Sequence, residues 1–157
     1  MSTATGSVTV DRPIAEVFHF ATTISNWGIM HPAMAQYLVN PPDHPTRVGE
    51  SFAEHTPMKM DILWTVKECA RPTRWTAEAP IGGKAGRRRP TGVFTFSYQL
   101  AEIDGGTSFE MSLSFTPQTF LGGLMDRLFF ERRDRKDVAM GIAHLKHAME
   151  NGNGAHH

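Results

Sequence analysis

The chain has 157 residues, of which 40% are hydrophobic and 20% are charged, values typical of one soluble globular domain rather than of a disordered or fibrous chain. Sixteen Lys and Arg residues balance sixteen Asp and Glu residues, which argues against an overall electrostatic grip on nucleic acid or on an anionic membrane. A single cysteine, Cys69, excludes an intramolecular disulfide and a multi-cysteine metal centre.

The sequence carries no signal for export or for membrane insertion. No apolar run approaches the roughly 20 residues that a membrane-spanning helix needs, and the Ser/Thr-rich first ten residues contain no apolar signal core. We therefore expect a cytoplasmic protein with a single domain over residues 1–157. Its core is expected over about 7–150, and residues 151–157 form a tail without structural signal.

The first quarter of the chain predicts one short strand followed by two short helices. The strand covers Ser7 to Val10 and ends before Pro13, which suits the first turn of a helix. Apolar residues then recur at helical spacing from Ile14 to Ile24. A second helical turn is expected over Ile29 to Ala35.

A run of strands follows. The expected strands are Gln36–Asn40, Glu50–Thr56, Lys59–Ala70, Arg74–Ala79, Val93–Ile103 and Thr107–Thr116. The last strand alternates most cleanly, with Phe109, Met111, Leu113 and Phe115 on the face expected to point inward. Asp104-Gly105-Gly106 before it is a hairpin signal. The Gly-, Pro- and Arg-rich stretch from Pro80 to Gly92 is expected to be a loop.

The last third of the chain changes to a helical period. Apolar residues from Leu121 to Met149 fit one face of a long helix, which the mixed-charge run Glu131–Asp137 interrupts. We interpret that run as a solvent-exposed helix face. The order of elements predicts an α+β fold, in which a curved antiparallel sheet of about six or seven strands surrounds the long C-terminal helix.

Short motifs along almost the whole chain carry a family resemblance. They are Val8-Thr-Val-Asp-Arg-Pro-Ile-Ala-Glu-Val-Phe18, Trp27 with His31-Pro32, Val48-Gly49-Glu50-Ser51-Phe52, Val66-Lys-Glu68 with Arg71-Pro72-Thr73-Arg74-Trp75, and Leu145-Lys146 with Glu150. In this order they resemble the START/SRPBCC (Bet v-like, helix-grip) superfamily, and most of them the polyketide cyclase/dehydrase branch. These motifs are structural, so they specify little about ligand or chemistry.

The resemblance implies a mostly apolar cavity between the sheet and the long helix, suited to a lipid, a polyketide or a similar molecule. Inward strand positions and two helix positions are expected to line it. These residues are Phe52, Ile62, Trp64, Trp75, Phe94, Phe96, Tyr98, Met111, Leu113, Leu124 and Leu128. For each of them, ordinary core packing is the alternative interpretation.

Three polar residues are candidate acid/base groups. Alternation with Phe52 turns Glu54 inward, where burial would raise its pKa, unless its strand is a solvated sheet edge. Tyr98 can donate a hydrogen bond to a ligand carbonyl, or it can simply cap the core. His31 is expected near the pocket mouth, where it can act near neutral pH; a surface or turn histidine is its alternative.

No metal site or other cofactor is expected. His144 and His147 have a ligand-like spacing but no acidic partner in register, and the terminal His156-His157 pair resembles a purification remnant. Lys84 and Arg87-Arg88-Arg89 form a basic loop segment that can attract an acidic ligand, although such runs are usually only solvated.

The sequence leaves three functions open. The first is binding or transport of a hydrophobic small molecule. The second is a cyclase, aromatase or dehydratase acting on a polyketide-like substrate, so whether the protein is an enzyme stays undecided. The third is partner binding of the activator-of-chaperone type. Polar groups that converge inside the pocket would favour the enzyme. We expect a monomer or homodimer with no nucleic-acid partner and no membrane insertion.

Overall fold

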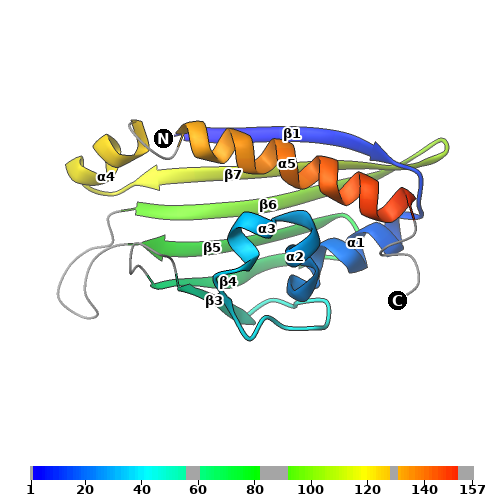
Figure 1. Ribbon diagram of the computed structural model, residues 1–157, viewed down its shortest axis with the longest axis horizontal. Helices are drawn as coiled ribbons and strands as arrows, with labels where there is room; N and C mark the ends of the chain where they lie inside the picture. Colours follow the sequence, from blue (N-terminus) through cyan, green and yellow to red (C-terminus); the bar gives the residue numbers. More distant parts are fainter. Residues whose placement is uncertain (1, 56–60, 82–91, 128–130, 152–157) are drawn as a thin grey trace.

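A computed structural model describes residues 2–55, 61–81, 92–127 and 131–151 of the chain (Figure 1). The predicted basic loop segment with Lys84 and Arg87–Arg89, the candidate Leu128 and most of the predicted tail lie outside these residues. The described elements are β1 (Ser2–Val10), α1 (Ile14–Thr22), a 3₁₀ turn (Ile24–Asn26), α2 (Trp27–Met30), α3 (Pro32–Ala35), β2 (Leu38–Val39), β3 (Ser51–His55), β4 (Asp61–Ala70), β5 (Arg74–Ile81), β6 (Gly92–Ile103), β7 (Gly106–Pro117), α4 (Phe120–Met125) and α5 (Glu131–Glu150).

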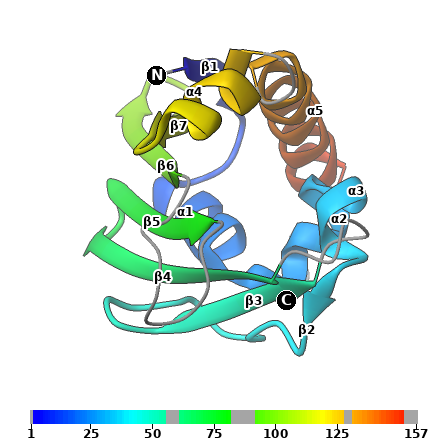
Figure 2. The ribbon, with the colours of Figure 1, turned by 90° about the vertical axis from the view of Figure 1, so that its left-hand side faces the viewer.

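The strands form one seven-stranded antiparallel sheet in the order β1-β7-β6-β5-β4-β3-β2. Successive strands from β2 to β7 are neighbours, and β1 returns to pair with β7. The sheet curls strongly. α5 runs along β1 and β7 and contacts α2, so that α5 and the short helices α2 and α3 cover the open side of the sheet (Figure 2). The predicted α+β helix-grip architecture is therefore confirmed.

The inward face of β7 has the predicted register. Phe109, Met111 and Phe115 are fully buried and Leu113 is 4% exposed, while the Ser and Glu residues between them are partly exposed. The same alternation buries one face of β6. Two neighbouring strands with period-two burial provide the apolar floor on which α5 and the short helices pack.

The first strand is longer than predicted. It covers Ser2–Val10 and pairs with β7 over its whole length, whereas the sequence indicated only Ser7–Val10. Its first half has few bulky apolar residues because α5 passes close over it. A Cβ atom on Gly6 would lie 2.9 Å from Ile142 Cδ1 and 3.1 Å from Val138 Cγ1. Gly6 thus faces α5 at a position where an alternating strand pattern would have an apolar side chain.

The C-terminal helix and the fifth strand also differ from prediction. The expected single helix is described as two elements, α4 (Phe120–Met125) and α5 (Glu131–Glu150), and residues 128–130 between them lie outside the described part of the chain. Leu124, predicted to face the cavity, is 45% exposed on α4, and that expectation is wrong for the side chain's orientation. β5 continues to Ile81, into the stretch predicted as loop, because Ile81 is buried and pairs with Gly92 of β6.

The middle of α5 approaches α2 and the sheet most closely at Gly141. A Cβ atom there would lie 2.9 Å from His31 Nδ1 and 3.1 Å from Met111 Sδ. His31 cannot easily give way, because its ring makes edge contacts with Trp27 and Phe96 at centroid distances of 5.2 and 5.4 Å. The absence of a side chain at Gly141 therefore sets how tightly the helix closes the core.

We predict that Gly141→Ala lowers the free energy of unfolding by about 1–3 kcal/mol, because overpacking outweighs the roughly 1 kcal/mol of helix propensity that Ala adds. Gly28→Ala in α2 is the matched control, since nothing lies within 4 Å of a Cβ at that position. In urea unfolding of both variants, Gly28→Ala should leave the free energy of unfolding unchanged or raise it. Equal stability of the two variants would show that the close approach at Gly141 is not a constraint.

Candidate functional site

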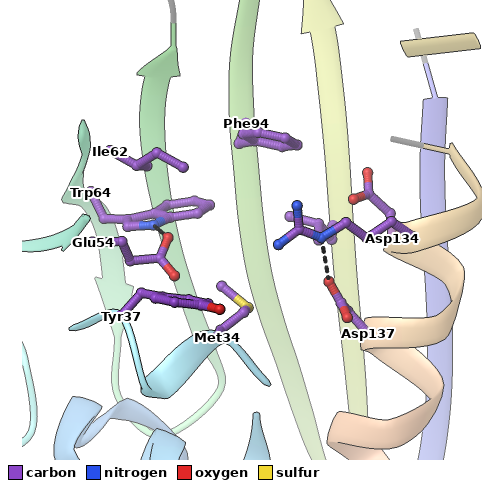
Figure 3. Close-up of a pocket in the computed structure, with 10 residues that line it drawn as sticks. Met34, Tyr37, Glu54, Ile62, Trp64, Phe94, Asp134 and Asp137 are labelled. Carbon is purple, nitrogen blue, oxygen red and sulfur yellow. Dashed lines mark hydrogen bonds and ion pairs between the residues drawn. The ribbon is translucent and has the colours of Figure 1, made fainter. Parts of the chain in front are cut away.

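One pocket lies at the end of the sheet where α5 begins, between β3, β4, β6 and β7 on one side and α5 on the other (Figure 3). It is lined by Met34, Tyr37, Glu54, Ile62, Trp64, Phe94, Leu113, Arg133, Asp134 and Asp137. The cavity volume is about 50 Å³, and the pocket is partly open to solvent. Typical drug-sized ligand sites measure roughly 300–1,000 Å³, so this is a compact site.

Glu54 points into this pocket from β3. It is 5% exposed, and its Oε2 accepts a hydrogen bond from Trp64 Nε1 at 2.9 Å. β2 pairs with β3 on its outer side, so Glu54 is not on a solvated sheet edge. Burial raises the pKa of the Glu54 carboxyl above its ordinary value, while the Trp64 hydrogen bond and the Arg133 charge pull that pKa down.

α5 supplies two further carboxyl groups from the opposite wall (Figure 3). Burial, followed by the charge of Asp137, raises the pKa of Asp134 to about 7. Asp134 is 3% exposed, and its Oδ2 has no hydrogen-bond partner within the described structure. Burial also raises the pKa of Asp137, although Arg133 Nε lies 3.7 Å from its Oδ2 and opposes the shift.

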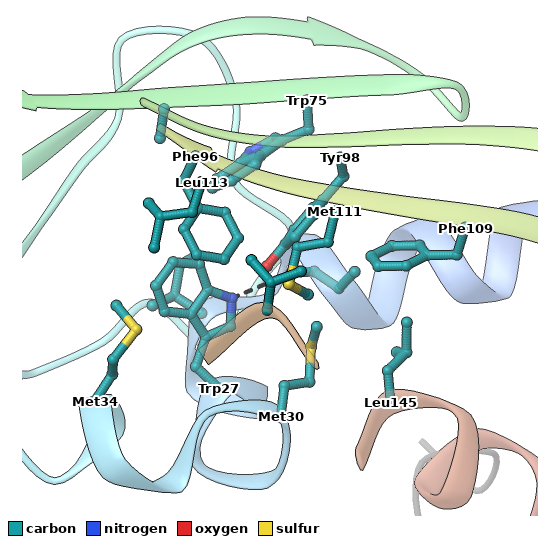
Figure 4. Close-up of a cluster of buried hydrophobic side chains, with 14 of the residues drawn as sticks. Trp27, Met30, Met34, Trp75, Phe96, Tyr98, Phe109, Met111, Leu113 and Leu145 are labelled. Atoms are coloured by element: carbon teal, nitrogen blue, oxygen red, sulfur yellow. Dashed lines mark hydrogen bonds between the residues drawn. The ribbon is translucent and has the colours of Figure 1, made fainter. Parts of the chain in front are cut away.

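The predicted cavity residues separate into two groups. Ile62, Trp64, Phe94 and Leu113 line the pocket together with Glu54. The others pack in a closed aromatic core around Trp27 (Figure 4). These core residues are Phe52, Trp75, Phe96, Tyr98 and Met111. Trp27 fills the space between these residues, since its ring lies 5.2 Å from the rings of both Phe52 and Phe96.

Tyr98 and His31 lie in this core rather than at a pocket mouth. The Tyr98 hydroxyl is fully buried, and burial raises its pKa well above 10. His31 is 4% exposed, and burial, followed by the charge of His144, lowers its pKa to about 3. His31 therefore stays neutral at physiological pH. It borders only a hollow of about 20 Å³ that Asp137 and Met140 also line.

Sequence reasoning missed the α5 carboxylates, because the run Glu131–Asp137 resembles a solvated helix face. The helical period nevertheless contains a signal for them. Asp134 stands four residues before the buried Val138, and Leu145 and Met149 continue the same stripe toward the helix end. Extending the apolar stripe backward by one turn would have placed Asp134 on the inward face. Met34 and Tyr37 had no comparable signal.

Among the described residues, no group of three or more His, Cys, Asp or Glu side chains is arranged to hold a metal ion. Within the same ranges, no helix has the length and apolar character needed to cross a membrane.

The fold is that of a helix-grip protein, with a partly open pocket between the sheet and α5. The family model "Polyketide cyclase / dehydrase and lipid transport" matches residues 1–150. The chain therefore belongs to this family, as the sequence motifs indicated. No curated protein compared with the sequence matches it.

Solved structures agree in fold at low sequence identity. Protein MLL2253 from Mesorhizobium loti matches with a TM-score of 0.68 and 10% identity over 95% of this chain and 97% of its own. The Aha1 dimer from Colwellia psychrerythraea matches with a TM-score of 0.63 and 14% identity over 97% and 98%. DynU16, described as a protein of the dynemicin biosynthetic locus, matches with a TM-score of 0.57 and 15% identity over 97% of this chain and 48% of its own. At these identities the likeness establishes the fold alone.

We predict that Asp134→Asn removes a pH-dependent penalty on folding. Because folding raises the pKa of Asp134 from 3.8 to about 7, ionising it disfavours the native state, and stability is lost as pH rises between these values. The stability of the variant relative to wild type should therefore increase by roughly 3–4 kcal/mol from pH ~4 to pH ~7.5, measured by urea unfolding. Asp43→Asn is the control, because that side chain is 95% exposed. A stability difference for Asp134→Asn that is constant with pH would contradict the prediction.

Proposed function

We propose that the protein binds or carries a hydrophobic small molecule in the pocket between the sheet and α5, with the apolar body of the ligand against the sheet and a polar end toward α5. The observation that carries this proposal is that the pocket lining combines apolar side chains with carboxyl groups. Ile62, Phe94 and Leu113 supply apolar walls, whereas Glu54 and Asp134 place carboxyl groups inside the same small space. Such a combination of apolar walls and a few placed polar groups is typical of ligand sites.

The size of the pocket favours a compact ligand. A volume of about 50 Å³ holds a few water molecules and leaves no room for a long acyl chain. A ligand of one or two rings would place only its polar end or part of a ring in this volume and would otherwise lie at the partly open mouth. We propose a single-domain, cytoplasmic protein that binds such a ligand as a monomer or homodimer; one structural neighbour is described as a dimer.

A second candidate function is catalysis of the cyclase or dehydratase type. One observation favours it: burial raises the pKa of Asp134 to about 7, so its carboxyl can both hold and release a proton at neutral pH. A substrate carbonyl near this group would be protonated or polarised, with Glu54 on the opposite wall. Tyr98 and His31, the other predicted acid/base residues, lie in the closed core and would need a rearrangement to contact a substrate.

The binding proposal predicts saturable binding of naphthylmethanol, a neutral two-ring probe, by isothermal titration calorimetry. Leu113→Trp and Ile62→Trp should each weaken binding by at least tenfold, because the larger side chains fill the pocket they line. Leu63→Trp is the matched control, since Leu63 is 53% exposed on the opposite face of β4. It should bind like wild type. Equal affinities for all four proteins would place the probe outside the pocket, and no saturable binding would count against the proposal.

The catalytic candidate predicts turnover of short poly-β-carbonyl thioesters. Asp134→Asn should then reduce the rate by about 10²–10⁴-fold, the usual contribution of a general acid or base. Tyr98→Phe and His31→Gln are expected to change folding stability more than rate, because both side chains lie in the core. Wild-type turnover in Asp134→Asn would remove this residue from the chemistry.

A further inference from the structure

The polar end of the pocket has an unbalanced charge. Three carboxyl groups line it, from Glu54, Asp134 and Asp137, against the one guanidinium of Arg133. That guanidinium is already engaged, since Arg133 Nε lies 3.7 Å from Asp137 Oδ2, and its side chain is 57% exposed. The Glu54 carboxylate has only a neutral donor, the Trp64 indole.

Asp134 is the member of this group with a buried carboxyl oxygen that has no hydrogen-bond partner in the described structure. Its Oδ2 is buried and unpartnered in a side chain that is 3% exposed and lines the pocket. A buried, unpaired carboxylate costs several kcal/mol unless a proton or a cation neutralises it. Asp134 in this pocket therefore either holds a proton or needs a cation from the ligand.

Within the described part of the chain, Arg133 is the cation that lines the pocket beside Asp134. On its own helix it faces Asp137 and Arg133, and Asp126 also lies near enough to raise its pKa. The inward side chains of β1 and β7 beneath α5 are apolar, including Ala4, Leu113 and Phe115. Across the pocket stand the Glu54 carboxyl and the Tyr37 ring, and the neighbouring hollow adds only the neutral His31.

We propose that the ligand of this pocket is an organic cation, a protonated amine on a compact apolar body, whose ammonium group is held by Asp134, with Asp137 on the same helix and Glu54 on the opposite wall. This inference rests on the proposed binding function and names its ligand class. The apolar body would lie against Ile62, Phe94 and Leu113. The Trp64 and Tyr37 rings provide aromatic faces, which attract cations as well as apolar groups.

The pH response separates this ligand class from a neutral carbonyl compound. The ammonium group needs Asp134 ionised, so its affinity should rise as pH increases through about 7, while the amine itself stays protonated. A neutral carbonyl that accepts a hydrogen bond from protonated Asp134 would bind more weakly over the same range. An anionic ligand would need to displace Asp137 from Arg133, and the remaining carboxylates would repel it.

The test compares naphthylmethylamine, naphthylmethanol and naphthoate, which share one ring system and differ in charge. In calorimetric titrations near pH 8 and at low salt, the amine should bind at least tenfold more tightly than the alcohol, and naphthoate most weakly. Amine affinity should fall about tenfold from pH ~8 to pH ~5.5, while alcohol affinity stays constant. Asp134→Asn should remove most of the preference for the amine. Arg133→Gln should increase that preference, and Asp43→Asn, distant and exposed, should leave it unchanged.

The outcomes distinguish the two proposals. Equal binding of amine and alcohol, or tighter binding of naphthoate, overturns the cation proposal and leaves the binding function intact. An amine preference that survives in Asp134→Asn also overturns it. Absence of binding by all three probes counts against the binding function itself. A preference for the amine that rises with pH and depends on Asp134 supports both.

Discussion

The close contact between α5 and the sheet, through Gly141 on the helix and Gly6 on β1, is the constraint on which the rest of the structure depends. Both positions lack a side chain where a Cβ would lie 2.9 Å from a neighbouring atom, of His31 and Ile142 respectively. The helix can therefore settle onto the inward faces of β1 and β7 and bury an apolar stripe. The same placement holds the first turns of α5 against the pocket, with Asp134 and Asp137 on its wall.

The interior has two parts, an aromatic core and a pocket with carboxyl groups, which differ in the side chains that line them. Toward the middle, Trp27 fills the space between α2 and the sheet, and its ring contacts Phe52, Trp75 and Phe96. Some polar atoms there are paired, since Trp75 Nε1 donates to Thr46 Oγ1 and that hydroxyl donates to the Thr22 carbonyl. Tyr98 Oη and His31 Nε2 are buried without a hydrogen-bond partner in the described structure. Only near the start of α5 do carboxyl groups replace aromatic rings, and there the packing opens into a pocket.

The sequence was informative wherever one face of an element is buried continuously. The period-two pattern of β7 located Phe109, Met111, Leu113 and Phe115 correctly, and the same logic turned Glu54 inward. The pocket itself could not be predicted, because strand alternation tells inward from outward but not packed core from open space. Asp134 was hidden by its charged neighbours, and β1 by its Ser, Thr and Gly content. For β1 a tertiary contact with α5, which no local pattern shows, decides the structure, whereas for Asp134 the apolar stripe of α5 held a signal that the charged neighbours obscured.

The place of β1 in the sheet has a consequence for the order of folding. Its partner β7 lies roughly one hundred residues later in the chain, so loop-closure entropy disfavours this pairing until the hairpins from β3 to β7 exist. During synthesis from the N-terminus, β1 leaves the ribosome before the other strands, and we expect it to pair with β7 after they have formed the rest of the sheet. A segment that waits unpaired benefits from low hydrophobicity, and Ser-Thr-Ala-Thr-Gly-Ser offers other chains little apolar surface on which to aggregate. The low hydrophobicity that weakens the strand signal of this segment thus also lowers the tendency of the nascent chain to aggregate.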